Sequence, residues 1–273
     1  MNTAVSLRKW RPAPFILASL SVHACALLLV LLAPAWWQWA LGAVLLDHAV
    51  IIAASLWPRS PLLGANLVRL PSAAAQRGEV ALTFDDGPDP QVTPQVLDIL
   101  AQHQVRATFF CIGEKAVAHP DICRDIVARG HTIENHGRYH RIYAAFSGIG
   151  GWMREIGEAQ EMLEYITGRR PQFFRAHAGM RNPFLDPVLH THDLSLASWT
   201  RRGYDTRCRD ADTVLSRLTR NLAAGDILLL HDGHAARTAN GTPVVLEVLP
   251  RLLAELAARS LHPVPLSTLC KPA

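Results

Sequence analysis

The stretch Glu79-Val80-Ala81-Leu82-Thr83-Phe84-Asp85-Asp86-Gly87-Pro88 decides the fold. A short apolar strand, residues 79–84, leads directly into two adjacent carboxylates, and Gly-Pro then turns the chain. Adjacent carboxylates repel each other unless a cation lies beside one of them, so one can bind a metal while the other stays free as a base. Taken alone, the stretch also fits an ordinary polar turn.

Downstream of this stretch, strand-like runs alternate with helix-like runs. Predicted strands cover residues 105–112, 131–134, 173–174, 194–199 and 226–230, and a last one begins at Val264. Predicted helices cover residues 93–103, 115–129, 151–167, 210–222 and 243–259, and another opens at Asn182-Pro183. Thr93 and Asp210 are the expected N-cap residues. Such alternation forms parallel βαβ units, so we predict an α/β barrel, complete or distorted, with its chemistry in the loops that follow the strands.

The composition narrows the class of protein. The chain has 273 residues, of which 49% are hydrophobic, and its mean hydropathy of +0.12 is high for a purely soluble protein. The net charge is +4, but no basic run or aromatic–basic interleaving indicates nucleic-acid binding. The five cysteines are odd in number and form no CxxC, so we expect neither a disulfide framework nor a cysteine metal site.

The apolar excess lies at the N-terminus. The expected divisions are a basic tail at 1–13, a membrane segment at 14–57, a linker at 58–78 and one catalytic domain at 79–273. Residues 14–33 carry no charge and, at about 1.5 Å per residue, can span a bilayer about 30 Å thick. Pro34 and three tryptophans suit an interfacial turn, and a second apolar run over 40–57 contains Asp47 and His48.

The flanking charges favour a helical hairpin. Arg8, Lys9 and Arg11 precede the apolar segment, and Arg59 and Arg69 follow it. Positive flanks on both sides place both ends in the cytoplasm, so we predict a bacterial inner-membrane protein with a cytoplasmic catalytic domain. The alternative is one spanning helix with the second run in the interface, which would put the domain on the other side.

Two further stretches carry candidate chemistry. His136 and His140 are four residues apart and share one face if their segment is helical, which is a common spacing in metal sites. With Asp86 they would supply three ligands and leave a fourth position for water, as a catalytic zinc requires. His231 ends the buried strand 226–230 and is a candidate general acid. Each histidine motif alone is also compatible with a structural role.

Together these stretches resemble the polysaccharide deacetylases with the NodB homology domain, carbohydrate esterase family 4. The family's Asp-Asp, His-x3-His, Arg-containing loop, Trp/Asp segment and Leu-x-His strand occur here in that order, between Thr83 and His231. The resemblance implies a distorted (β/α) barrel of NodB-homology type that removes an N-acyl (acetyl) group from an amino sugar. It also implies one divalent metal ion, usually Zn²⁺.

The resemblance assigns roles by position. Its catalytic and metal-binding set is Asp85 as general base, Asp86, His136 and His140 as metal ligands, and Arg175 as the partner that keeps Asp85 ionised. Its remaining set is the backbone N–H of Ala178 toward the oxyanion, Trp199 in the acyl pocket, Asp205 orienting His231, and His231 as general acid. The family's Arg-x-Pro-aromatic-Gly loop reads Arg-Ala-His-Ala-Gly here, so His177 replaces proline and either faces the site or caps the loop.

Several hypotheses on the substrate stay open. A cytoplasmic domain favours a lipid-linked saccharide, whereas a domain on the other side favours peptidoglycan or an exported polysaccharide. Arg201-Arg202 and Arg207, beside the fourth motif, suit a phosphate or simply a solvated loop. The competing functions are deacylation of a non-sugar amide or ester, and a non-catalytic glycan-binding membrane protein.

Overall fold

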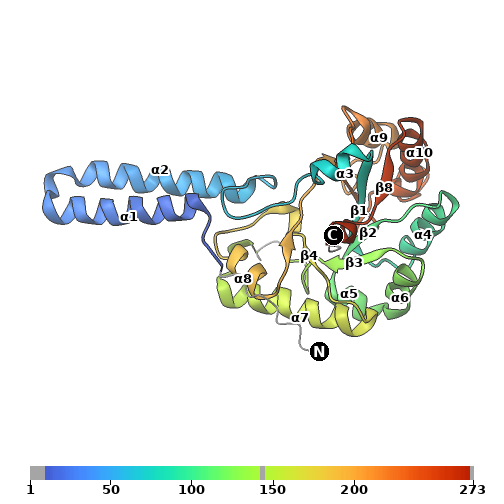
Figure 1. Ribbon diagram of the computed structural model, residues 1–273, viewed down its shortest axis with the longest axis horizontal. Coiled ribbons are helices and arrows are strands. Elements are labelled where there is room, and N and C mark those ends of the chain that lie inside the picture. The colour runs from blue at the N-terminus through green and yellow to red at the C-terminus, as the bar shows by residue number, and fades with distance from the viewer. Residues whose placement is uncertain (1–9, 142–144, 271–273) are drawn as a thin grey trace.

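The computed structural model describes residues 10–141 and 145–270. Most of the predicted basic tail, including Arg8 and Lys9, lies outside the described residues. A long helical hairpin projects from an α/β body in which helices surround a curled sheet (Figure 1).

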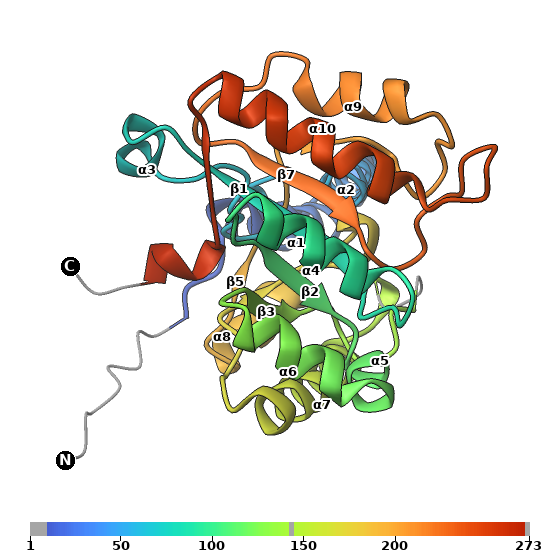
Figure 2. The same cartoon turned by 90° about the vertical axis from the view of Figure 1, so that its right-hand side faces the viewer.

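Strand β1 (Glu79–Gly87) lies near the middle of a parallel sheet. Its neighbours are β2 (Thr108–Cys111) and β7 (Ile227–His231), and the register sets Asp85 opposite both Phe110 and His231. The other strands are β3 (Thr132–Asn135), β4 (Phe173–Phe174), β5 (Ser195–Leu196), β6 (Arg201–Arg202) and β8 (His262–Val264). The order is β5-β4-β3-β2-β1-β7-β6, with β8 beside β1, so within the described chain β5 and β6 do not close the ring. The predicted distorted barrel is confirmed (Figure 2).

Alternate residues of β1 face opposite sides of the sheet. Val80, Leu82 and Phe84 pack into the outer core, which helices α4 (Thr93–Gln102), α9 (Ala211–Thr219) and α10 (Val244–Ala258) cover. Ala81 faces the inner cluster on the concave side. Because side chains alternate along a strand, Asp85 also faces inward. Burial of both faces explains the continuous apolar run.

Two local predictions about helix 93–103 and helix 115–129 are wrong. Thr93 is the first residue inside α4 and not its N-cap, because its hydroxyl donates to Asp232 at 2.6 Å instead of capping the helix. The predicted helix 115–129 is two helices, α5 (Gly113–Ala118) and α6 (Pro120–Ala128). Pro120 disfavours helical backbone at the preceding residue and has no N–H to continue α5.

The other helices agree with their predicted positions. Helix α7 (Ile149–Thr167) ends at Gly168, whose φ of 67° is the left-handed conformation that favours glycine at this position. Asp210 caps α9 as predicted, since its carboxylate accepts the N–H of Thr213 at 3.1 Å. Helix α8 (Leu185–Thr191) follows the expected start at Asn182-Pro183.

The segment from residue 58 to residue 78 packs against the body. It contains the short helix α3 (Ser72–Gln76), and the side chains of Leu63, Leu70 and Ala74 are buried. Leu67 forms a parallel bridge with Ala197, next to β5. The segment predicted as a linker therefore contributes apolar side chains to the inner core.

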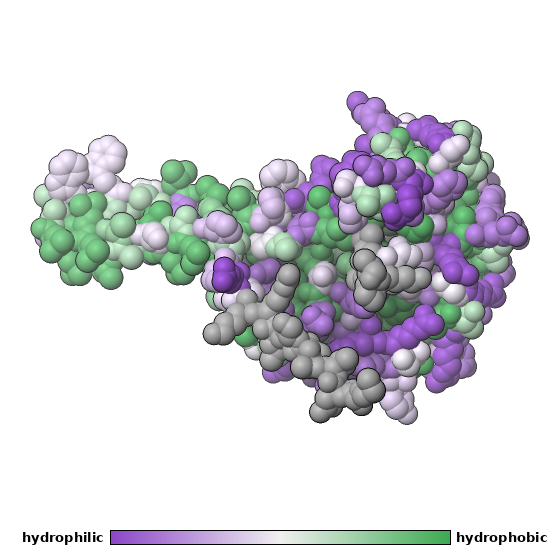
Figure 3. All heavy atoms as spheres, in the orientation of Figure 1, coloured by the Kyte–Doolittle hydropathy of each residue, from purple (hydrophilic) through white to green (hydrophobic). Residues whose placement is uncertain are grey.

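The N-terminal helices fit the predicted hairpin. Helix α1 (Pro14–Leu32) and helix α2 (Trp37–Leu56) lie side by side, joined by a 3-10 turn at Pro34–Trp36 (Figure 1). Both are long and apolar enough to cross a membrane, judged by length and composition. Their outer surfaces are apolar, in contrast to the polar body (Figure 3).

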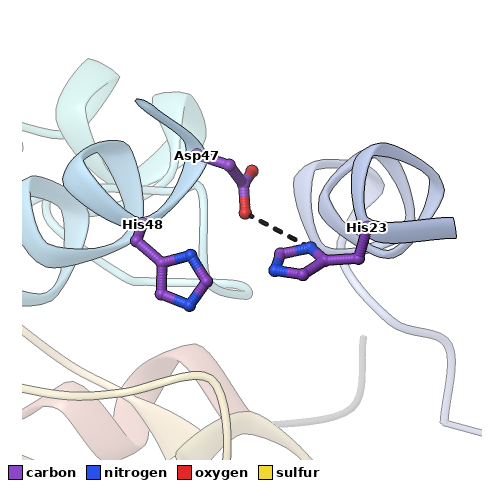
Figure 4. A group of neighbouring side chains, drawn as sticks. All are labelled: His23, Asp47 and His48. Atoms are coloured by element: carbon purple, nitrogen blue, oxygen red, sulfur yellow. Dashed lines mark ion pairs between the residues drawn. The ribbon is translucent and has the colours of Figure 1, made fainter. Parts of the chain in front are cut away.

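A polar cluster joins the two helices halfway along the hairpin. Ser19 of α1 donates its hydroxyl to Asp47 of α2 at 2.7 Å, and His23 Nδ1 lies 3.8 Å from the same carboxylate. His48 lies beside this pair, with its ring centroid 5.1 Å from that of His23 (Figure 4). The predicted Asp47-His48 pair thus makes interhelical contacts near the middle of the apolar hairpin.

Candidate active site

A cavity of about 350 Å³ lies at the carboxyl ends of β1 and β7. Its lining includes the predicted site residues Asp85, Asp86, His136, His140, His177, Ala178, Trp199 and His231. Arg175 and Asp205 are fully buried directly behind it. The structure therefore brings all the predicted site residues together, although they span almost 150 positions of the chain.

Asp85 is held by a fully buried arginine. Arg175 Nη1 donates to Asp85 Oδ1 at 2.6 Å and to Thr83 Oγ1 at 2.8 Å. The other guanidinium nitrogens donate to the backbone carbonyls of Ala197 and Ser198, so the arginine has one fixed position. A charged hydrogen-bond donor this close fixes the orientation of the Asp85 carboxylate toward the cavity.

Asp86, His136 and His140 form a compact cluster. One ligand atom from each lies within 4.8 Å of the others. Asp86 Oδ1 lies 3.1 Å from His136 Nε2 and 2.7 Å from His140 Nε2. Burial opposes ionisation of Asp86, but hydrogen bonds from the neighbouring histidines outweigh it and hold its pKa well below the usual range.

The His-x3-His segment is a turn, and the helical form of the prediction is wrong. Gly137 and His140 both have positive φ, at 83° and 57°. Asn135 Oδ1 accepts the N–H of Gly137 at 2.8 Å, and Glu155 Oε1 accepts the N–H of Tyr139 at 2.8 Å. These bonds close the turn, so the two rings reach Asp86 from a loop at the end of β3.

The donor set fits a transition-metal ion. His136 Nδ1 donates to the carbonyl of Arg175 at 2.8 Å, so Nε2 is the nitrogen that faces Asp86 and the one that would bind a metal. Metal-binding histidines are usually oriented by such a bond. Two imidazoles and one carboxylate, with the cavity open beside them, match the three-ligand set of catalytic zinc sites.

His231 and Asp205 form a second buried pair. His231 Nδ1 donates to Asp205 Oδ1 at 2.8 Å, and the backbone N–H of His231 donates to Oδ2 at 2.7 Å. Burial lowers the pKa of His231, but the Asp205 carboxylate outweighs it and raises the value to about 9. The ring is therefore protonated at neutral pH, with its other nitrogen available to the cavity.

The divergent loop places His177 and Ala178 at the cavity wall. Ala178 has a φ of 51°, and no acceptor within the described chain takes its backbone N–H. His177 Nδ1 makes a short contact with His140 Nε2, so its ring faces the predicted metal ligands. Burial lowers the pKa of His177 to about 4, with His140 adding to the effect. Of the two alternatives for His177, the structure shows it facing the site.

Sequence reasoning missed one histidine at the site. His234 lines the cavity, and its Nδ1 lies 3.4 Å from Asp86 Oδ2. It follows His231 by three residues, after the turn Asp232-Gly233, and this proximity to a strand-end histidine was the available signal. Thr206 and Arg207 also line the cavity.

Comparison with known proteins agrees with these features. A family profile described as polysaccharide deacetylase matches residues 72–197. A peptidoglycan-N-acetylglucosamine deacetylase of Bacillus cereus is 34% identical over 178 residues, which cover 63% of this chain and 81% of that protein. A chitooligosaccharide deacetylase of Sinorhizobium fredii is 34% identical over 168 residues, covering 60% of this chain and 76% of its own length.

Solved structures show the same fold. A peptidoglycan N-acetylglucosamine deacetylase in complex with an N-hydroxybenzamide superposes with a TM-score of 0.67 at 28% identity, over 75% of this chain and 92% of that one. A family 4 carbohydrate esterase of Streptomyces lividans in complex with acetate gives a TM-score of 0.62 at 29% identity, over 68% and 91%.

Proposed function

Because the chain belongs to the polysaccharide deacetylase family, we propose that it is a metal-dependent hydrolase that removes the N-acetyl group of an amino sugar. The observation that carries this proposal is the pairing of a carboxylate and an imidazolium across one cavity. Asp85, fixed by Arg175, lies beside the Asp86–His136–His140 cluster, and His231, protonated through Asp205, lies opposite Asp85 in the register of β1 and β7.

The arrangement supplies the proton transfers that amide hydrolysis needs. Asp85 accepts a proton from the attacking water, and Arg175 holds its carboxylate aimed at the cavity. The free N–H of Ala178 donates to the oxyanion as the carbonyl carbon becomes tetrahedral. His231 then gives its proton to the sugar nitrogen, which leaves poorly as an amide anion. Trp199, with 7% of its surface exposed, forms an apolar wall for the acyl methyl.

We propose that Asp86, His136 and His140 hold one zinc ion. When bound, it supplies a Lewis acid beside Asp85 that lowers the pKa of water and polarises the acetyl oxygen. Support comes from the ligand spacing, the orientation of His136 by the Arg175 carbonyl, and the position of the Asp86 carboxylate between the two imidazoles.

We propose that the hairpin anchors the enzyme in a bacterial inner membrane, with the catalytic domain on the cytoplasmic side. The apolar exposed faces of α1 and α2 support insertion, and the basic residues Arg11 and Arg59 at the two open ends support the orientation. The substrate is then a saccharide carried on a lipid in the same membrane. A domain on the opposite side would instead meet peptidoglycan or an exported polysaccharide.

The test uses the full chain in detergent with chitooligosaccharides as substrate. Free acetate and bound metal are measured on the same preparation of the wild type, Asp85→Asn and His140→Ala. We expect one equivalent of zinc and acetate release in the wild type, metal without activity in Asp85→Asn, and loss of both in His140→Ala. His103→Ala, at an exposed histidine outside the site, is the matched control. Full acetate release by Asp85→Asn would contradict the proposed mechanism.

A further inference from the structure

A second cavity, of about 500 Å³, adjoins the catalytic one on the side of the hairpin. Trp199 and Arg202 line both cavities. The second cavity extends from these two residues to the end of α2 and to α9; its other lining residues are Trp57, Pro58, Arg59, Thr200, Arg201, Tyr204, Arg217 and Arg220. We call this second cavity the arginine groove.

The arginine groove carries uncompensated positive charge. Five of its lining residues are arginines and none is a carboxylate. Arg201 is already engaged, because it is bonded at 2.7 Å to Asp226, which it shares with Arg69, and to two backbone carbonyls. The other four, Arg59, Arg202, Arg217 and Arg220, form no ion pair with any described residue.

Arg202 gives the strongest evidence for a bound anion, because one of its nitrogen atoms lacks a hydrogen-bond acceptor in the described structure. Its Nε is buried and has no hydrogen-bond partner within the described residues. Its guanidinium lies 5.2 Å from the centre of the Trp199 ring and 5.0 Å from the centre of the Tyr204 ring. A partly desolvated, unpaired guanidinium is costly unless an anion completes its hydrogen bonds. Its planar fork matches a phosphate.

The groove also lies next to the point where the hairpin meets the body. The backbone N–H of Arg181, just after the catalytic loop, donates to the carbonyl of Ser55 in the last turn of α2 at 3.1 Å. Ser198 Oγ donates to the carbonyl of Pro58 at 2.7 Å. Trp57, between these two contacts, is 55% exposed, as suits a residue at a membrane interface.

We propose that the arginine groove binds the phosphate of a glycosyl phosphate, so that the amino sugar enters the catalytic cavity while its lipid chain extends along the hairpin. This assignment rests on the proposed deacetylase function and adds the substrate class to it. Arg202, shared by both cavities, sets the reach between the phosphate and the sugar ring. Arg59, Arg217 and Arg220 supply the remaining positive charge.

The experiment compares two synthetic substrates on the full chain in detergent. One is an octyl phosphate ester of N-acetylglucosamine linked through its anomeric oxygen, and the other is the neutral octyl glycoside of the same sugar. We expect the wild type to have a kcat/KM at least tenfold higher for the phosphate substrate. In Arg217→Gln/Arg220→Gln we expect KM for that substrate to rise at least tenfold, with kcat and the neutral substrate unchanged. Both side chains are exposed, so the fold should tolerate the change. Arg169→Gln, at an exposed arginine outside the groove, is the matched control.

Three outcomes overturn the inference. Equal kcat/KM for the two substrates would show that the groove does not recognise the phosphate group of the substrate. A similar loss on both substrates in the double variant would indicate a structural effect. If octyl phosphate without the sugar competes as strongly as the glycosyl phosphate, the groove is a headgroup site and not a substrate subsite.

A binding measurement distinguishes failure of the proposed deacetylase function from failure of the proposed groove. If neither substrate releases acetate, binding of both to Asp85→Asn is measured by calorimetry. Tighter binding of the phosphate ester, lost in the added Arg217→Gln/Arg220→Gln, would retain the groove while rejecting the reaction. Equal binding of both compounds would reject the groove as well.

Discussion

Replacing Asp205 by asparagine should move the alkaline limit of activity toward acid. Asp205 is fully buried and makes two bonds to His231, one to the ring and one to the backbone N–H. It is the main reason that the pKa of His231 is raised to about 9 although burial acts in the opposite direction. Asparagine preserves the shape and an acceptor for the ring N–H but removes the charge. The pKa of His231 should therefore fall to about 6.5 or below.

The size of the effect depends on pH in a calculable way. At pH 8 the protonated fraction of His231 would fall from about 90% to about 3%, a loss of about 30-fold in rate from protonation alone. At pH 6 the same substitution changes that fraction by only about 1.3-fold. The ratio of the two losses, about 20-fold, isolates the titration from any general damage to the site.

The assay is kcat/KM for acetate release between pH 5.5 and pH 9, with metal content measured at each pH. Asp226→Asn is the control, because Asp226 is equally buried and pairs with arginines at the other end of β7. It should leave the shape of the profile unchanged. A loss in Asp205→Asn of equal size at pH 6 and pH 8 would refute the reasoning, since it would show that Asp205 acts by position and not by charge.

Other perturbations test other parts of the structure. Removal of metal with a chelator should abolish acetate release by the wild type, and His140→Ala, which is expected to lose its metal on purification, should regain activity only with at least tenfold more added zinc than the wild type, measured by titrating activity with zinc. Burial lowers the pKa of His131 to about 4, so the unfolded chain takes up a proton that the folded chain does not between pH 6.5 and pH 4. The free energy of unfolding of the wild type should therefore fall by about 2 kcal/mol more than that of His131→Asn when the pH is lowered from 7 to 5, as measured by denaturant unfolding. A chain starting at residue 79 loses two buried leucines, each worth about 1.5–3 kcal/mol, and should melt well below one starting at residue 58.

The fold could be predicted because its signals are local. β1 and β7 are apolar on both faces, which only a covered parallel sheet explains, and Asp210 caps a helix through its own neighbours. The split of the predicted helix 115–129 was a missed local signal, Pro120, whereas the predicted cap at Thr93 failed because a residue distant in sequence decided the outcome. Thr93 had the pattern of an N-cap, but its hydroxyl donates a hydrogen bond to Asp232, which follows the neighbouring strand β7. No residue near Thr93 in the sequence predicts that contact.

At the site, the sequence likewise predicted which residues come together but not the backbone conformation that brings them there. The residue types and their order indicated Asp86, His136 and His140, yet the backbone that joins the two histidines is a turn and not a helix. The turn depends on Glu155, fifteen residues further on, which accepts the N–H groups of Tyr139 and His140. His234 was missed for a similar reason, because its position beside Asp86 follows from the turn after β7.

The contact between the hairpin and the catalytic loop links anchoring to chemistry. Ser55 and Pro58, at the base of α2, bond to Arg181 and Ser198, which flank the catalytic loop and the acyl pocket. A side chain at Gly179 would collide with Pro58 and Trp199, so the left-handed glycine permits this close approach. The base of the hairpin is thus part of the wall that supports the loop carrying Ala178, the proposed oxyanion donor. Because that wall and the arginine groove share Trp199 and Pro58, a substrate bound at the membrane surface would meet the arginines of the groove and the catalytic cavity along one continuous surface.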